Sequence, residues 1–279
     1  MEKRIWLITG ISSGLGKALA EMVIESGDFV IGTFRKAQQV TKFNLSYPGK
    51  GFAYLLDIKD HRAIENMTQS IRRDFTGVDV LVNNAGVGFI GAVEESSMEE
   101  VRQVFEANFF GALKLTQEVL PMLREKSSGH IVQISSHGGL KAFAGFGIYN
   151  ASKFALEGFS EALEQEVRPL GIRVSLVEPG PFRTKFAASG LQEAKKTIPD
   201  YAETAGAFRT KLKSVDGKQE GDPKKAAHAI VNLVNSNNPS IRLPLGRVAL
   251  STIAMKLDSV KNDLENNREI ASNAVYEKI

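Results

Sequence analysis

The chain has 279 residues, of which 43% are hydrophobic, and its formal net charge is +3. These values are ordinary for a soluble globular protein with one substantial core. Basic residues are scattered along the chain, so we expect no nucleic-acid partner. There is no cysteine, which excludes disulfides and thiolate chemistry. Without a signal peptide or an apolar run of about 18 residues, we expect a cytoplasmic protein with no membrane partner.

The first predicted element is a buried strand at residues 5–9, followed by a glycine-rich turn and a helix at residues 17–26. Backbone N–H groups at such a helix N-terminus can bind a pyrophosphate. Gly10 permits the tight turn, Gly14 lets the backbone approach the phosphates, and Gly16 lets helix and strand pack closely. A glycine turn without a ligand is the alternative.

The second predicted strand, residues 29–33, carries no acidic residue at its end. Dinucleotide folds often place an acid there to bind the ribose hydroxyls of adenosine. Here the chain continues with Phe34 and Arg35, and a guanidinium matches a 2′-phosphate through its planar fork. We therefore expect NADP, with NAD less favoured. The alternative is that Arg35 is an ordinary surface arginine.

Two further strands are predicted at residues 51–56 and 79–83. Asp57 follows the first, where it could meet the adenine amino group or cap the helix that starts around Asp60. The second ends in Asn83, Asn84, Ala85 and Gly86, whose amides suggest a tight turn that ties neighbouring strands together. We expect the backbone of this turn to contact the cofactor.

The next stretch is predicted as one long helix over residues 95–123, with Asn108 interrupting its apolar stripe. A buried amide must be hydrogen-bonded, and it can hold a local irregularity or a water molecule. A fifth strand, residues 129–135, delivers Ser136 at its carboxyl end. A helix at 149–168 and a sixth strand at 172–177 follow, and the prolines after the strand fix a rigid loop.

Tyr149 and Lys153 are four residues apart, so in a helix their side chains lie on one face, one turn apart. A nearby ammonium favours the phenolate, and we therefore predict that the pKa of Tyr149 falls from about 10 towards neutrality. Such a phenol would serve as a proton donor, and Ser136 could bring a hydroxyl to the same point. Taken alone, this spacing is also typical of an exposed helix face.

Strand and helix thus alternate six times, which predicts a single α/β domain over residues 1–279. The fold class is a doubly wound (Rossmann) parallel sheet with helices on both faces. Ligands bind at the carboxyl ends of the strands in such a sheet. Six residues fall at these ends: Gly10, Arg35, Asp57, Asn83, Ser136 and Pro179.

Residues 185–221 break this rhythm. They predict a mobile lid over an apolar substrate, with a dimer contact as the alternative. A helix at 223–235 and a short strand at 241–243 follow. Residues 246–267 predict an amphipathic C-terminal helix, which could pack on the body, on the lid or on a second subunit.

At residues 3–250 the chain resembles the short-chain dehydrogenase/reductase family. The matching motifs are T-G-I-S-S-G-L-G, N-N-A-G, the single Asn108, Ser136 with Y-N-A-S-K, and P-G-P-F-R-T. The resemblance implies a central sheet of about seven strands. It also implies a catalytic set of Asn108, Ser136, Tyr149 and Lys153. Many NADP-using relatives carry a basic residue where this chain has Ser13, whereas Arg35 matches the other NADP determinant.

The expected cofactor-binding residues combine the family's contact positions with the turns described above. They are Gly10, Ser12, Ser13, Gly14, Leu15, Gly16, Arg35, Asp57, Ile58, Asn84, Ala85, Gly86, Tyr149, Lys153, Pro179, Gly180 and Thr184. The four histidines have no metal-ligand spacing, so we expect no metal.

The leading hypothesis is an NADP-dependent oxidoreductase that moves a hydride between nicotinamide and a carbonyl or secondary alcohol of an apolar small molecule. Ser136 would stabilise the developing alkoxide and Tyr149 would supply the proton. By resemblance, Lys153 would also hold the nicotinamide ribose and Asn108 a water molecule. The alternatives are an NAD-linked alcohol dehydrogenase and a non-catalytic dinucleotide-binding sensor. The family commonly forms dimers or tetramers through helices at 95–123 and 149–168, so a homodimer or homotetramer is expected.

Overall fold

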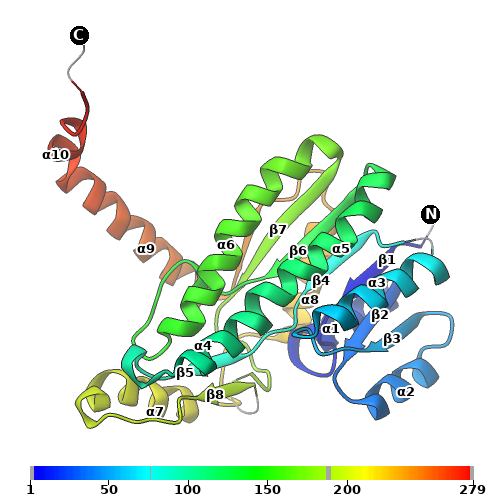
Figure 1. The fold of residues 1–279 in the computed structure, drawn as a ribbon, viewed down its shortest axis with the longest axis horizontal. Helices are drawn as coiled ribbons and strands as arrows, with labels where there is room; N and C mark the ends of the chain where they lie inside the picture. Colours follow the sequence, from blue (N-terminus) through cyan, green and yellow to red (C-terminus); the bar gives the residue numbers. More distant parts are fainter. Residues whose placement is uncertain (1–2, 76, 187–189, 277–279) are drawn as a thin grey trace.

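The computed structural model describes residues 3–75, 77–186 and 190–276. Its centre is a parallel sheet of seven strands in the order β3-β2-β1-β4-β6-β7-β9 (Figure 1). The strands are β1 (Ile5–Ile8), β2 (Phe29–Phe34), β3 (Gly51–Leu55), β4 (Val80–Asn83), β6 (Gly129–Ile134), β7 (Ile172–Pro179) and β9 (Arg242–Leu245). The predicted doubly wound parallel sheet is therefore confirmed.

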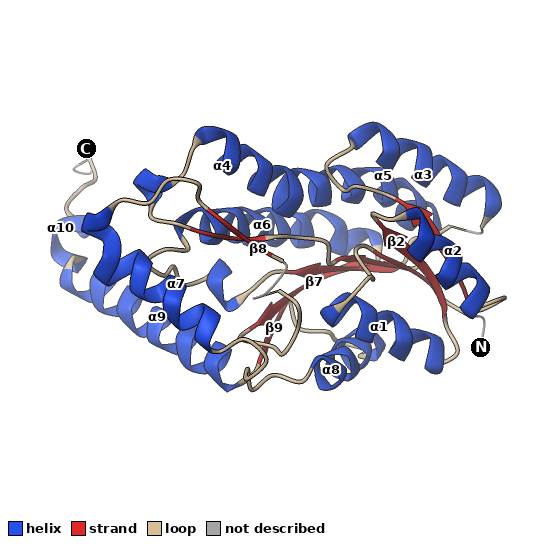
Figure 2. Cartoon of the chain, turned by 90° about the horizontal axis from the view of Figure 1, so that it is seen from below, coloured by secondary structure: helices blue, strands red, loops and turns tan. Residues whose placement is uncertain are grey.

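Helices cover both faces of the sheet (Figure 2). One face carries α3 (His61–Asp74), α5 (Gly111–Lys126) and α6 (Gly147–Val167), which pack through one buried apolar cluster. The other carries α1 (Gly14–Glu25), α2 (Ala37–Ser46) and α8 (Pro223–Asn235), packed through a second cluster. Because the central strands are covered on both sides, every residue of β1 and β4 is buried, rather than every second one.

The strand order fixes the position of the ligand crevice. From β1 the chain builds outward to β2 and β3, then returns to place β4 on the other side of β1. The connections above β1 and β4 therefore run in opposite directions, which opens a crevice at their carboxyl ends. The glycine turn after β1 and the Asn83–Asn84 turn after β4 border this crevice.

The single long helix predicted over residues 95–123 is wrong in its start and in its continuity. Residues Val93–Glu95 form a short 3₁₀ turn, and α4 (Met98–Phe105) begins after Ser97, which forms a capping box with Glu100. A π-helical segment, Glu106–Phe110, then joins α4 to α5. It contains Asn108, at the point where the apolar stripe is interrupted.

Residues 190–221 follow β7 and form several short elements of their own. β8 (Leu191–Glu193) pairs in parallel with β5 (Gly88–Ile90), and a π-helical turn, Ala202–Gly206, leads into α7 (Ala207–Ser214). The nearly fully buried carboxylate of Glu95 anchors this region. It accepts a hydrogen bond from the Ile198 N–H at 2.9 Å and pairs with Arg209 at 3.1 Å.

The chain ends in α9 (Arg247–Asn266) and the short α10 (Arg268–Ser272), which extend away from the body (Figure 1). Within the described residues, no helix is both long and apolar enough to cross a membrane.

Candidate active site

The glycine turn after β1 is shaped by two residues with left-handed backbone and by one close contact. Gly10 has a φ of +71° and Gly14 a φ of +60°, which side-chain-bearing residues rarely adopt. A Cβ on Gly16 would lie 2.7 Å from the Gly10 carbonyl oxygen and would also collide with the Asn84 amide. Glycine at position 16 is therefore required for α1 to start this close to the turn.

The turn after β4 is tied to the glycine turn by hydrogen bonds. The Asn84 side chain donates to the Thr9 carbonyl at 2.8 Å, and the Thr9 hydroxyl accepts from the Asn84 and Ala85 N–H groups, each at 2.9 Å. Asn83 instead donates to Thr116 on α5 at 2.9 Å. The two amides thus tie neighbouring elements together, as the sequence suggested. Thr9 joins the two turns, and it was not among the predicted site residues.

The glycine turn after β1 fits a dinucleotide pyrophosphate. α1 begins at Gly14 with no side-chain cap from Ser13 and no acidic residue in its first turn, so nothing there repels or replaces an anion. Thr184, from the loop after β7, faces the glycine turn, because a Cβ built on Gly14 would lie 3.2 Å from the Cβ of Thr184. In that loop, Pro179 ends β7 and the Gly180 N–H donates to Leu245 of β9 at 2.9 Å.

Arg35 and Asp57 follow β2 and β3 on the same edge of the sheet. The side chain of Arg35 is exposed beyond the end of β2. Asp57 accepts a hydrogen bond from the Lys59 N–H at 3.1 Å. The alternative that Asp57 caps the next helix is wrong, because Asp60 accepts the N–H of Ala63 at 2.9 Å and is the cap.

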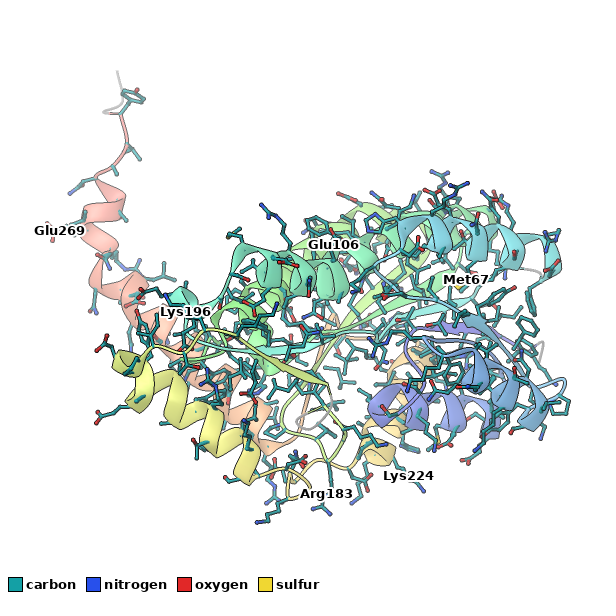
Figure 3. The ribbon with its side chains drawn as sticks, turned by 60° about the horizontal axis from the view of Figure 1, so that its bottom comes forward. Met67, Glu106, Arg183, Lys196, Lys224 and Glu269 are labelled. Atoms are coloured by element: carbon teal, nitrogen blue, oxygen red, sulfur yellow. The ribbon has the colours of Figure 1, made fainter. Side chains whose placement is uncertain are left out.

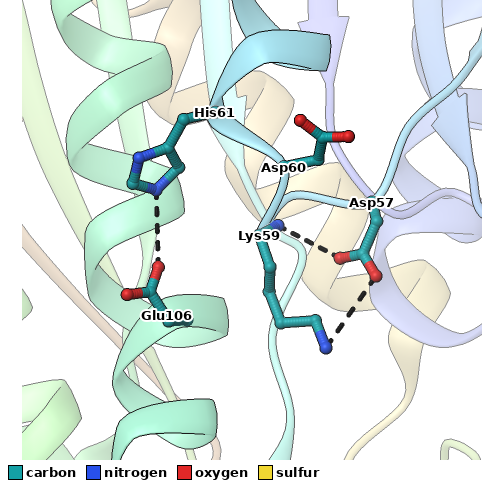
Figure 4. A pocket seen from close by; sticks show the side chains of 5 residues that line it. All are labelled: Asp57, Lys59, Asp60, His61 and Glu106. Carbon is teal, nitrogen blue, oxygen red and sulfur yellow. Dashed lines mark hydrogen bonds and ion pairs between the residues drawn. The ribbon is translucent and has the colours of Figure 1, made fainter.

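An open hollow lies beside Asp57 (Figure 4). Its other lining residues are Lys59, Asp60, His61 and Glu106, and the His61 ring lies 3.4 Å from the Glu106 carboxylate. Charges of both signs line the hollow, and none of the proposed catalytic residues does. Within the described residues, no three His, Asp or Glu side chains group closely enough to hold a metal ion.

Asn108 is buried, and its side chain makes three hydrogen bonds. Its amide donates to the Val87 carbonyl at 2.9 Å and to the Ser152 hydroxyl at 3.0 Å, and its oxygen accepts the Val87 N–H at 2.8 Å. These bonds tie the π-helical segment to the chain after Gly86 and to α6. A π-turn displaces backbone carbonyls from their usual partners and is common at functional sites.

Ser136 and Tyr149 meet across Gly138. Ser136 begins a short turn in which its hydroxyl oxygen accepts the Gly138 N–H at 3.0 Å, so its own proton remains available for donation. A Cβ on Gly138 would lie 3.3 Å from that oxygen and 3.6 Å from a ring carbon of Tyr149. Asn150 holds this turn by donating to the Gly138 carbonyl at 2.8 Å. Gly138 and Asn150 support the site but were not among its predicted members.

Lys153 lies on the other side of the site, close to Asn108. Its amine donates to the Ile134 carbonyl at 2.8 Å, at the end of β6. A Cβ on Gly86 would lie 3.0 Å from the Asn108 amide oxygen and 3.7 Å from the Lys153 amine. The structure therefore gathers Asn108, Ser136, Tyr149 and Lys153 at the carboxyl ends of β4 and β6.

The predicted fall in the Tyr149 pKa is wrong. Burial raises the pKa of Tyr149 to about 12, against a smaller lowering by hydrogen bonding with Ser136. Burial likewise lowers the pKa of Lys153 to about 8, and the Glu157 carboxylate partly opposes this shift. The physical reason is that desolvation of the phenolate outweighs its hydrogen bond with Ser136, while the Lys153 amine is bound to the Ile134 carbonyl. Tyr149 therefore keeps its proton throughout the neutral range.

Aromatic and aliphatic side chains surround Tyr149. Its ring centroid lies 5.0 Å from that of Phe146 and 5.7 Å from that of Phe186. Leu191 and Phe208, from the region after β7, pack against the same buried cluster. The predicted lid region thus contributes apolar side chains beside the phenol. Its residues 187–189 lie outside the described residues, and its mobility stays a prediction.

A buried ionic cluster of Glu157, Glu178 and Arg242 begins one helical turn beyond Lys153. Arg242 of β9 pairs with Glu157 at 3.2 Å and approaches Glu178 of β7 to 3.1 Å. The side chain of Glu178 is 0% exposed, and neither of its carboxylate oxygens has a hydrogen-bond partner. Burial, followed by repulsion from Glu157, raises the pKa of Glu178 to about 7. The members of this cluster are far apart in the chain, so no local sequence pattern indicated it.

The raised pKa of Glu178 predicts a pH-dependent stability. Between about pH 4.5 and pH 7 the unfolded chain has lost a proton that the folded protein retains, so the free energy of unfolding should fall as the pH rises. Glu178→Gln should be more stable than the wild type above pH 7, by on the order of 2 kcal/mol, and the difference should vanish near pH 4. Urea unfolding of both proteins across this range measures it. A difference that does not change with pH would contradict the assignment.

A sheet, glycine turn and Ser–Tyr–Lys constellation of this kind define a dinucleotide-dependent oxidoreductase. The family model for short chain dehydrogenases matches residues 4–195. The 3-ketodihydrosphingosine reductase of Bacteroides thetaiotaomicron is 38% identical over 249 residues, 88% of this chain and 89% of that protein. A solved short-chain dehydrogenase from Streptomyces avermitilis is 40% identical with a TM-score of 0.93, covering 99% of this chain and 100% of that one. The chain belongs to the short-chain dehydrogenase/reductase family.

Two more distant solved structures contain cofactor. A family member from Burkholderia phymatum in complex with NAD has a TM-score of 0.81 at 22% identity, covering 94% of this chain and 95% of that one. ElxO with NADP bound has a TM-score of 0.73 at 25% identity, covering 90% of this chain and 100% of that one. Proteins of this fold thus bind either dinucleotide.

Proposed function

We propose that the protein is an NADP-dependent reductase of apolar ketones, which also oxidises the corresponding secondary alcohols. The observation that carries this proposal is the meeting of Ser136 and Tyr149 across Gly138, beside Lys153 and the glycine turn. A binding module would need the glycine turn but would have no use for a buried phenol beside a hydroxyl. This argument favours an enzyme over a non-catalytic sensor.

A bound nicotinamide supplies the hydride, and the chain supplies everything else. The Ser136 hydroxyl donates a hydrogen bond to the carbonyl oxygen of the substrate, where negative charge develops. The protonated Tyr149 gives its proton to that oxygen. Lys153 places a positive charge near the resulting phenolate and stabilises it. Asn108 holds the π-helical segment in place beside Lys153.

The substrate class follows from the surroundings of Tyr149. Phe146 belongs to the same buried cluster as Tyr149, and the partly buried side chains of Phe143, Leu191, Phe208 and Leu212 pack against that cluster. Such a wall favours an aliphatic or aromatic substrate over a charged one. The named activity of the Bacteroides relative suggests including 3-ketodihydrosphingosine among the test substrates.

The test is a substrate screen with purified protein, followed by nicotinamide absorbance. We expect NADPH oxidation with apolar ketones and none with short, charged oxo acids. Failure with every carbonyl, together with tight NADPH binding, would favour the sensor alternative.

Cofactor choice is tested by Arg35→Asp. The wild type should bind NADPH at least about 10-fold more tightly than NADH, because a charge-assisted contact to a phosphate contributes roughly 1.5–3 kcal/mol. The variant should lose NADPH affinity and retain or gain NADH affinity. Lys36→Asp, one residue further along the same exposed loop, is the matched control. A wild type that prefers NADH would overturn this part of the proposal.

A homodimer or homotetramer is part of the proposal. Phe110 and Phe154 are 41% and 42% exposed, on the π-helical segment before α5 and on α6 respectively. These are the helices through which the family commonly associates. Large exposed aromatic side chains on such a face favour burial against a second copy.

A further inference from the structure

The C-terminal helix begins on the body and then leaves it. Near its start, Ala249, Thr252 and Ile253 are buried where α9 contacts β9 and the turn after Ser136. From Leu257 to the end of α10 at Ser272, every residue is exposed. Figure 3 shows Glu269 far from the sheet and its covering helices. The outer half of this long helix therefore has no packing partner within the described part of the chain.

The apolar residues of this outer half nevertheless form a regular seam. Leu257, Val260 and Leu264 continue the alternating steps of three and four residues that Leu250 and Ile253 begin, of which Ile253 packs on the body. Leu257 and Leu264 are 63% and 67% exposed. This spacing is that of the a and d positions of a coiled coil, in which each apolar residue packs into a facing helix. A helix this exposed is only marginally stable in water without such packing.

The charges beside the seam favour a second copy of this chain over a lipid surface. Residues 247–272 contain Arg247, Lys256, Lys261 and Arg268 against Asp258, Asp263, Glu265 and Glu269. Interfacial membrane helices are instead rich in lysine and arginine on their polar face. A helix with equal numbers of basic and acidic residues can pair its charges with those of a second copy across a two-fold axis.

We propose that α9 pairs in antiparallel orientation with α9 of a second copy of this chain. With Leu257 packed on the partner's Val260, Val260 packs on the partner's Leu257 by symmetry. On one flank of the seam, Lys256 then lies beside the partner's Asp263, and Asp263 beside the partner's Lys256. A parallel pair would instead bring Lys256 towards the partner's Lys261. Flanking charges set the orientation of such pairs, and here they select the antiparallel one.

Charge exchange in the full-length protein tests the pairing and its register. Sedimentation equilibrium should show that Lys256→Asp and Asp263→Lys each weaken the association step about 10-fold, because each creates two like-charge pairs. The double variant should restore it. Asp258→Lys, on the opposite side of the helix, is the matched control and should leave association unchanged. Stronger association of Lys256→Asp would indicate the parallel pair and overturn the proposal, as would single variants that behave like the wild type.

Cross-linking gives an independent result, because the chain has no cysteine of its own. Leu257→Cys and Val260→Cys proteins, mixed and oxidised, should form a mixed disulfide faster than either protein alone forms its own. Fastest cross-linking of Leu257→Cys with itself would overturn the antiparallel register. Absence of any cross-link, with co-sedimentation on phosphatidylcholine–phosphatidylserine vesicles that Leu257→Asp abolishes, would overturn the proposal in favour of a lipid surface. These outcomes do not depend on cofactor or substrate, so they are separate from the test of the proposed activity.

Discussion

Tyr149→Phe is expected to lower kcat by about 10²- to 10⁴-fold, the usual contribution of a positioned proton donor. The change removes only the phenolic oxygen, so the ring should keep its packing against Phe146 and Phe186. The Ser136 hydroxyl is a much weaker acid than a phenol, and the Lys153 amine is bound to the Ile134 carbonyl, so neither neighbour is positioned to replace this proton donor efficiently. Steady-state rates with an apolar ketone and NADPH measure the effect.

NADPH affinity and the unfolding midpoint should stay close to those of the wild type in this variant. Tyr47→Phe is the matched control, since it removes the same atom from a tyrosine that packs on α2, on the opposite face of the sheet. Full turnover by Tyr149→Phe would remove the proposed acid and with it the mechanism. The unfolding curve distinguishes a loss of turnover caused by the missing proton donor from one caused by unfolding.

Arg242→Ala is expected to destabilise the fold by about 3 kcal/mol, because it leaves two buried carboxylates without their cation. The Arg242 side chain is 27% exposed, whereas Glu157 and Glu178 are 5% and 0% exposed. The loss should be larger near pH 8 than near pH 5.5, because protonation relieves the repulsion between the acids. Urea unfolding at about these two pH values measures it.

Two further variants make this result specific. Arg268→Ala removes an arginine whose pair with Glu265 is exposed, and it should leave the urea midpoint close to that of the wild type. Adding Glu178→Gln to Arg242→Ala should recover part of the stability, since it removes one of the two unpaired acids. If Arg242→Ala unfolds at the wild-type urea concentration at both pH values, the cluster does not stabilise the protein.

The local sequence determined the repeating strand–helix pattern and therefore the doubly wound sheet. Buried apolar runs, glycine turns and chain order act over short distances, and parallel strands with right-handed crossovers leave few ways to assemble them. The same local signals located Gly10, Gly14 and Gly16 in the first turn. They placed Ser136, Tyr149 and Lys153 at the carboxyl edge of the sheet, and the resemblance to the family assigned their roles.

Only the tertiary structure decided how these groups affect one another. The sequence predicted a Tyr149 pKa near neutrality from helical spacing alone, but burial raises that pKa to about 12, and the Lys153 amine donates to the Ile134 carbonyl. Spacing along a helix gives proximity, whereas a pKa depends on desolvation by residues from the whole chain. For the same reason the Glu157–Glu178–Arg242 cluster, built from one helix and two strands, became visible only when the sheet brought its members together.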